Sequence, residues 1–315
     1  MSNTILLDPV TRIEGHLAVK VEVDNHRVTQ AFVSGEMFRG FEQILRGRDP
    51  LDAQHITQRI CGVCPVEHGV ASVLAQEDAF GITPPSNARL VRNLMQAANF
   101  IMSHITHFYL LSALDFVDVA AVVNYSGNDP GLGSLRDWAK GQVSSKSVLP
   151  VAPFMPRYAA KYLQDAEANY TALRHYLDAF EMRTLAQQIG AIFAGKLPHA
   201  ATLTPGGVTE NVSALKIAQF RSKLTRLQTF INTAYLPDVM AVAGAFPEYF
   251  QTGAGLGNYL SYSAFPEGEG TTRQFFPGGV LMQGKLQPVD VEANLLCLED
   301  VPHPQTLIHR QLQPR

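Results

Sequence analysis

Hydrophobic and polar residues alternate in two short segments near the start of the chain. The alternation covers positions 17–23 and 28–33, and Asp24, Asn25 and His26 lie between them. Alternation with a period of two on both sides of a short polar turn is typical of paired antiparallel strands. The pattern therefore predicts a β-hairpin near the amino terminus.

Longer segments have apolar residues three and four positions apart, as on one face of a helix. The clearest of these begins near Ser86 or Asn87, either of which can cap a helix, and continues in some form to about position 123. Further helices are expected at positions 52–60, 66–80, 157–194 and 210–236. Asp52 and Thr209 are candidate caps for the first and the last of these.

Proline and glycine mark the expected ends and connections. Pro237 is expected to end the last long helix. Residues 126–156 are rich in Gly, Ser, Asp and Pro and are expected to form a long connection, whereas residues 275–282 suggest extended structure with a turn at Pro277 and Gly278. Together the elements predict a mainly α fold with small β portions (α+β): a long central helix bundle with an amino-terminal antiparallel hairpin.

The composition is that of a chain that buries a core. Of the 315 residues, 46% are hydrophobic and 17% are charged, which argues against disorder. A net charge of -3 gives no attraction to nucleic acid or to an anionic membrane, so no nucleic-acid partner is expected. The start of the chain lacks the pattern of a signal peptide. Two His and two Asp interrupt the most apolar stretch, 100–123, which is therefore expected to be a buried helix and not a membrane span.

The most informative motif is a pair of cysteines separated by two residues, Cys61 and Cys64. The chain has only one other cysteine, Cys297, so a disulfide framework is excluded. Two thiolates at this spacing can reach one soft metal ion, but the motif alone also fits half of a zinc site, a redox dithiol or two packed thiols. Zinc is disfavoured because no second cluster of ligands follows, and a thioredoxin-like dithiol because a helix is expected before Cys61.

Several further motifs occur in a fixed order along the chain, and together they resemble the large subunit of nickel-iron hydrogenases. They are DPVTRIEGH at 8–16, RGFE at 39–42, GRDP at 47–50, QRICGVC at 58–64, HITHFY at 104–109, ALD at 113–115, GKLPH at 195–199 and PGGVT at 205–209. The resemblance runs to about residue 290. It implies one incomplete large-subunit domain over residues 1–315, with a divergent tail at 291–315.

The resemblance implies roles for individual residues of the metal centre. Cys61 resembles the terminal nickel thiolate, and Cys64 resembles the thiolate that bridges nickel and iron. Carbon monoxide and cyanide ligands on the iron are also implied. Glu42 resembles a carboxylate that helps to hold magnesium, although in isolation it would be taken for a surface or ion-paired glutamate.

Two more residues are implied to act in catalysis. Glu14 resembles the glutamate that relays protons away from the centre, because cleavage of hydrogen releases a proton that must leave through a titratable group. His68 is expected one helical turn after Cys64, where it could donate a hydrogen bond to the bridging sulfur. A core histidine satisfied by a carbonyl is the alternative for His68, and an ordinary glutamate is the alternative for Glu14.

The resemblance ends before a second Cys-x-x-Cys motif followed by His, which closes the centre in the family. Cys297 and His303 do not reproduce that spacing. Two thiolates do not complete a four-sulfur nickel environment, so the chain is expected to be inactive by itself, and a truncated or frame-shifted sequence would explain the loss.

Three hypotheses for function follow. The first is a hydrogenase large subunit that oxidises H₂ reversibly and passes electrons to an iron-sulfur small subunit, after assembly by maturation factors. The second is a noncatalytic scaffold of the same fold that docks a small subunit. The third is weak nickel or zinc binding by Cys61 and Cys64, with His68 and Cys297 as nominal further ligands. Localisation stays open, because such large subunits are exported with a partner's signal or remain inside.

Overall fold

A computed structural model of the chain describes residues 3–145, 161–253, 255, 257–268 and 274–289. Contacts between residues divide the chain into two compact units, residues 1–246 and 247–315. The prediction of a single incomplete domain concerns the whole chain and stays a prediction. Cys297 and His303 lie outside the described residues.

The first unit contains the helices and the longest strands. Its helices are α1 Phe41–Leu45, α2 Ala53–Thr57, α3 Pro65–Phe80, α4 Ser86–Ile105, α5 Pro130–Ser145, α6 Ala166–Ala194, α7 Ala214–Phe230 and α8 Leu236–Ala245. Its strands are β1 Asn3–Leu7, β2 Leu17–Asp24, β3 Arg27–Gly35, β4 Leu203–Thr204 and β5 Gly207–Val208. Tight helical turns lie at Pro50–Asp52, Gln58–Ile60, Ala113–Asp115 and Val119–Asn124, and π-helical turns at Thr106–Ser112 and Ile231–Tyr235.

The predicted hairpin is confirmed as the pair β2–β3. Leu17 pairs with Gly35 and Asp24 with Arg27 in an antiparallel register, with one irregularity between Glu22 and Val23. The sequence pattern missed β1, which pairs antiparallel with the other edge of β2 and makes a three-stranded sheet with the order β1-β2-β3. Most residues of β1 and β3 are exposed, which explains why the short β1 carries no clear alternation of buried and exposed positions.

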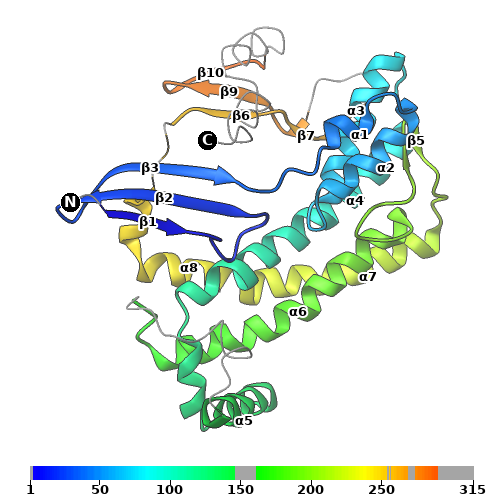
Figure 1. The fold of residues 1–315 in the computed structure, drawn as a ribbon. Helices are drawn as coiled ribbons and strands as arrows, with labels where there is room; N and C mark the ends of the chain where they lie inside the picture. Colours follow the sequence, from blue (N-terminus) through cyan, green and yellow to red (C-terminus); the bar gives the residue numbers. More distant parts are fainter. Residues whose placement is uncertain (1–2, 146–160, 254, 256, 269–273, 290–315) are drawn as a thin grey trace. The chain divides into compact units, whose positions relative to one another are not determined.

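The predicted central bundle is confirmed, with α4, α6 and α7 packed along one another (Figure 1). Their shared core contains Met95, Ile105, Ile189, Phe193 and Leu227, among other side chains. Gly190 of α6 lets two helices approach closely: a Cβ added there would lie 3.3 Å from the Cβ of Ala98 in α4 and 2.3 Å from Leu197. The long helix predicted from Ser86 begins at that residue, with Pro85 in the capping position, and continues through the π-helical turn Thr106–Ser112.

The expected connection at 126–156 is wrong in part, because α5 occupies Pro130–Ser145. Asp129 caps this helix: its carboxylate accepts a hydrogen bond of 2.9 Å from the backbone N–H of Leu132. Leu132 is buried against Val117, Val122 and other apolar side chains of a second small core. Gly and Ser in α5 have a weak intrinsic preference for helical structure, so the helix depends on tertiary packing for its stability.

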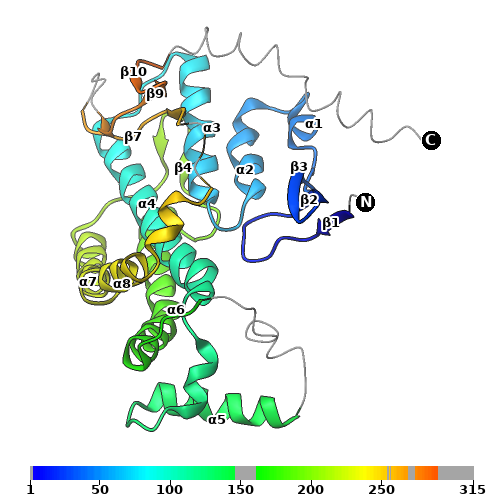
Figure 2. The same ribbon diagram turned by 90° about the vertical axis from the view of Figure 1, so that its left-hand side faces the viewer.

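The boundaries of the last helices also differ from the predictions. Ser213, and not Thr209, caps α7, since its hydroxyl accepts a hydrogen bond from the N–H of Lys216. Thr209 instead pairs through its backbone N–H with Thr202. Pro237 does not end the helical run; it lies in the first turn of α8, where the missing N–H is tolerated, and α8 follows α7 after a π-helical turn (Figure 2).

The expected helix at 157–194 begins later, as α6 at Ala166 with Asp165 as its cap, and positions 157–160 lie outside the described residues. The described part of the second unit contains a tight helical turn at Pro247–Gln251 and five short strands. The strands are β6 Tyr259–Ser261, β7 Ala264–Pro266, β8 Gln274–Phe276, β9 Gly279–Met282 and β10 Lys285–Gln287. The extended structure at 275–282 is confirmed, but β8 pairs with β7 whereas β9 pairs with β6 and β10. In the described part of the chain, no helix combines the length and apolar character needed to cross a membrane.

Candidate metal centre

Cys61 and Cys64 lie on the short connection between the turn Gln58–Ile60 and helix α3. Cys61 ends the turn in an extended conformation, and Cys64 occupies the capping position of α3. Pro65 follows as the first helical residue, where proline is favoured because its N–H is not needed. The sequence therefore fixes both thiols at the start of a helix, and both are partly accessible.

Backbone N–H groups point at the sulfur of Cys61. The N–H groups of Val63 and Cys64 each donate to this sulfur over 3.3 Å. The turn therefore holds the Cys61 sulfur in a fixed orientation.

The free thiol of Cys64 is in a different electrostatic environment. Its pKa is raised to about 12, first by burial and then by the hydrogen bond and charge of Cys61. The carboxylates of Glu14 and Glu67 contribute in the same direction. Burial first, and the neighbouring acidic groups second, keep Cys64 protonated in the metal-free chain, and a bound divalent cation would favour the thiolate.

Glu14 is brought to the cysteine pair from the loop between β1 and β2. The thiol of Cys61 donates to its carboxylate over 3.8 Å. This loop is anchored by the ion pair between Arg12 and Asp115 and by a backbone hydrogen bond of 2.8 Å from Val10 to Leu17. A carboxylate and two thiols that are far apart in sequence therefore lie in one cluster.

Two other predicted site residues, Glu42 and His68, make no side-chain hydrogen bond to this cluster among the described residues. Glu42 is exposed in the first turn of α1. His68 is partly buried in α3, and burial lowers its pKa, which favours the neutral ring. In the described part of the chain, no hydrogen bond joins the ring of His68 to either cysteine.

A further carboxylate, Glu67, lies near the cysteine turn and was not among the predicted site residues. Glu67 lies one turn into α3 and accepts hydrogen bonds from Gln96 over 2.6 Å and from Asn99 over 3.2 Å. Burial raises the pKa of Glu67 to about 7, and the two amide donors only partly oppose this. No local pattern around Glu67 indicates this environment, because both donors come from α4.

Two further side chains contact the backbone of the cysteine turn. Arg39 donates to the carbonyl of Arg59 over 3.0 Å and to the carbonyl of Ile60. The ring of His199 hydrogen-bonds to the backbone of Cys61 or of Gln58. Both belong to motifs that carried the resemblance, RGFE and GKLPH, but the sequence did not indicate what they contact.

The chemistry of the donor set fits part of a nickel-iron centre. Two thiols on one turn suit a soft metal ion, and the nearby carboxylate of Glu14 suits proton exchange. Among the described residues, no three His, Cys, Asp or Glu side chains converge closely enough to hold a metal ion. The pair could supply two ligands of such a centre.

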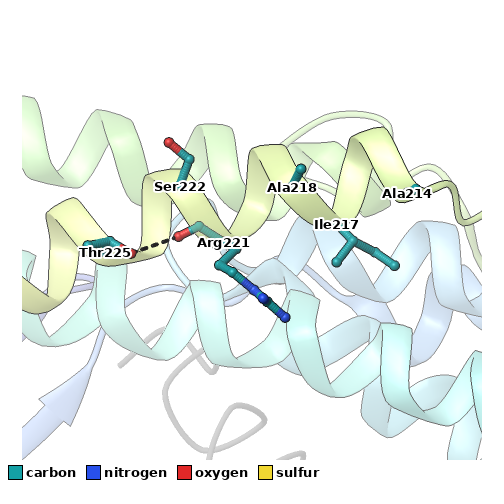
Figure 3. A pocket seen from close by; sticks show the side chains of 6 residues that line it. All are labelled: Ala214, Ile217, Ala218, Arg221, Ser222 and Thr225. Carbon is teal, nitrogen blue, oxygen red and sulfur yellow. Dashed lines mark hydrogen bonds between the residues drawn. The ribbon is translucent and has the colours of Figure 1, made fainter.

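A surface depression lies elsewhere, on helix α7. Figure 3 shows its six lining side chains, Ala214, Ile217, Ala218, Arg221, Ser222 and Thr225, all on this one helix. They include no carboxylate, thiol or imidazole, so the depression offers no group for acid-base or metal chemistry. The cysteine turn remains the better candidate site.

Comparison with known proteins agrees with this choice. The family model for nickel-dependent hydrogenases matches residues 39–303, and a second model, described as HoxL-like, matches residues 4–34. The first match covers most of the chain and includes both cysteines of the turn. The chain belongs to the nickel-dependent hydrogenase family.

Individual relatives extend the comparison. The chain is 40% identical over 295 residues to the periplasmic [NiFeSe] hydrogenase large subunit of Desulfomicrobium baculatum, which covers 91% of this chain and 52% of the relative. It is 36% identical over 309 residues to the hydrogenase-2 large chain of Escherichia coli K12, covering 91% and 54%. The chain thus spans about half the length of these relatives.

The fold is shared with solved structures of the family. The Ni-Fe-Se hydrogenase of D. vulgaris Hildenborough in the reduced state matches with a TM-score of 0.78 and 38% identity, over 92% of this chain and 55% of that chain. The predicted fold class and the predicted resemblance are both confirmed.

Proposed function

We propose that this chain is the amino-terminal part of a hydrogenase large subunit, whose whole protein oxidises H₂ reversibly to protons and electrons. The observation that carries the proposal is the cluster of Cys61, Cys64 and Glu14. The sulfur of Cys61 is held by two N–H donors and lies 3.8 Å from the carboxylate of Glu14. Family membership and the order of the motifs support the same function.

Each residue of the cluster has a role in this proposal. Cys61 holds nickel as a terminal ligand, and Cys64 bridges nickel and iron. The nickel-iron centre, when bound, supplies the cleavage of H₂. Glu14 accepts the released proton, because its carboxylate is close to the cysteine sulfur and exposed to solvent. His68 supports the bridging sulfur, and Glu42 contributes an oxygen ligand to magnesium.

Other parts of the proposed centre lie outside this chain's described residues. Carbon monoxide and cyanide complete the coordination of the iron, and an iron-sulfur small subunit accepts the electrons. Maturation factors insert the metals. The relatives are named large subunits or large chains, and each is about twice as long as the matched region, so the proposal assigns the remaining ligands to sequence that corresponds to their other half.

The test is metal analysis and infrared spectroscopy of the whole protein, in which this chain is joined to sequence that corresponds to the other half of its relatives, coexpressed with a small subunit and maturation factors. Nickel and iron in equal amounts, together with bands of iron-bound carbonyl and cyanide, are the expected result for the complete centre. Cys61→Ser and Cys64→Ser should each remove nickel, whereas Cys297→Ser serves as the control and should retain it. Absence of both metals from the whole wild-type protein would favour the noncatalytic scaffold.

A second variant tests the proton acceptor. Glu14→Gln keeps the size of the side chain but removes its basicity, so it should retain both metals and lose about 100-fold in H₂ oxidation. Full activity in this variant would exclude Glu14 as the proton acceptor without changing the assignment of the metal ligands.

A further inference from the structure

The turn that precedes the proposed metal ligand is held by two side chains from distant parts of the chain. The backbone of residues 58–61 receives hydrogen bonds from Arg39 and from His199. Carbonyls at the end of a helical turn have no partner within the turn and must find one elsewhere. Arg39 provides the partners for Arg59 and Ile60, and the neutral His199 ring, with its single N–H, can provide a partner for either Gln58 or Cys61.

Arg39 contacts this turn through both terminal nitrogens of its guanidinium group. One donates to the carbonyl of Arg59 over 3.0 Å and the other to the carbonyl of Ile60. The guanidinium carbon lies 4.8 Å from the ring centroid of Phe41, which packs against its face. The planar group is therefore fixed in orientation, which a flexible ammonium group would not be.

His199 contacts the turn from the segment that follows α6. Its backbone has a φ of +68°, in the left-handed region, and its partly buried ring hydrogen-bonds to the backbone of Cys61 or Gln58. A non-glycine residue in this conformation is uncommon and is retained only where surrounding contacts require it.

We propose that Arg39 and His199 are positioning residues that fix the Cys61 sulfur in its ligand geometry by binding the backbone of residues 58–61, which leads into it. Neither side chain touches the metals in this proposal. The consequence for metal binding rests on the proposed function, whereas the consequence for the geometry of the turn does not. Positioning of this kind is a common requirement for metal sites, since ligand orientation determines affinity.

The direct test is hydrogen exchange on the metal-free chain. The N–H groups of Val63 and Cys64 donate to the Cys61 sulfur, so their protection reports the geometry of the turn. Arg39→Ala should speed exchange at both amides by about tenfold while leaving α4 unchanged. Arg39→Lys should give an intermediate increase in the exchange rate, because a single ammonium group cannot reproduce both hydrogen bonds of the planar guanidinium group.

Arg48→Ala is the matched control for the arginine. Arg48 is also exposed and also donates to a backbone carbonyl, that of Ile44, over 2.9 Å, but it does not contact the cysteine turn. Its removal should leave exchange at the two amides unchanged. His199→Asn tests the second positioning residue, since asparagine tolerates the left-handed backbone but lacks the ring; it should also speed exchange at the turn.

The second measurement is the binding of Co²⁺ to the cysteine pair, monitored by the thiolate-to-metal charge-transfer absorption. Arg39→Ala should weaken Co²⁺ binding about tenfold relative to Arg48→Ala. Unchanged exchange at the turn in Arg39→Ala and His199→Asn would overturn the proposal, as would an increase spread equally over α4. Faster exchange at the turn in a chain that binds no Co²⁺ would support the positioning role and count against the metal assignment instead.

Discussion

Helix α3 carries two buried or partly buried carboxylates, ten residues apart, in opposite electrostatic environments. Glu77 is paired with Arg92 over 2.6 Å, and both side chains are almost completely buried, at 5% and 6% exposure. Glu67 accepts hydrogen bonds only from the neutral amides of Gln96 and Asn99, and among the described residues no cation pairs with it. One carboxylate is neutralised by a fixed partner, and the other is not.

Glu77 belongs to a structural ion pair, whereas the charge of Glu67 is expected to change with pH near neutrality. Arg92 also donates to the carbonyls of Thr204 and Gly207, so the pair joins α3 and α4 to the β4–β5 hairpin. The Glu77 carboxylate completes this network by accepting from the N–H of Gly206 over 2.8 Å. Glu67, near the cysteine turn, lacks such compensation, and burial raises its pKa to about 7.

The largest expected effect comes from breaking the structural pair. Arg92→Ala leaves the Glu77 carboxylate buried without a cation, so the free energy of unfolding should fall by about 3–5 kcal/mol in urea denaturation. The matched control is Arg226→Ala, which removes an equally short but exposed ion pair with Glu181 and should cost less than 1 kcal/mol. Similar losses in both variants would contradict the structural role of the buried pair.

A pH-dependent effect is expected at the other carboxylate. Because the pKa of Glu67 is higher in the folded chain than its ordinary value of 4.5, the folded state binds more protons between these values, and stability falls as pH rises from about 4.5 to 7. Glu67→Gln removes this dependence. Relative to wild type, the metal-free variant should gain about 2 kcal/mol between pH 5 and pH 8, measured by urea denaturation.

The control for this variant is Asp78→Asn, at an exposed position of the same helix. Its stability relative to wild type should change by less than about 0.5 kcal/mol over the same pH range. A pH profile for Glu67→Gln that is parallel to that of Asp78→Asn would show that Glu67 is as well compensated as a surface carboxylate, and the contrast with Glu77 would be lost.

The smallest effect concerns the amides that hold Glu67. Asn99→Leu removes one donor, so the pKa of Glu67 should move further upward and the free energy of unfolding should fall by about 1 kcal/mol. The pH dependence of stability, compared with Glu67→Gln, measures both changes. The double variant combines Asn99→Leu with Glu67→Gln. If its change in free energy of unfolding equals the sum of the changes in the two single variants, Asn99 acts independently of the Glu67 carboxylate and the proposed link between them is wrong.

Local sequence patterns predicted the elements whose boundaries depend on nearby residues. The hairpin β2–β3 and helix α3 were expected at nearly the observed positions, because alternation, turn residues and a following Gly81 act over a few residues. Helix α5 was missed, since its stability depends on packing of Leu132 against residues elsewhere in the chain. Pro237 was expected to end the last long helix. It lies instead in the first turn of α8, after a π-helical turn, where its missing N–H is tolerated.

The candidate site was predictable in composition but not in arrangement. The spacing of Cys61 and Cys64 and the order of the motifs indicated the ligands, and resemblance added Glu14 as their neighbour, which the hydrogen bond to Cys61 is consistent with. No comparable pattern indicated Glu67, because its environment is formed by two amides on another helix. The roles of Glu42 and His68 stay predictions.

The sequence by itself determined the family, the helical bundle and the pair of thiols, because each follows from residues close together or from motifs in a fixed order. Only the tertiary structure decided which groups meet at the cysteine turn. Arg39 is 20 residues from Arg59 in sequence, and His199 is farther still from Cys61, so no local preference brings them together. Burial of the core between α4 and α6 supplies the free energy that holds such distant polar groups in contact.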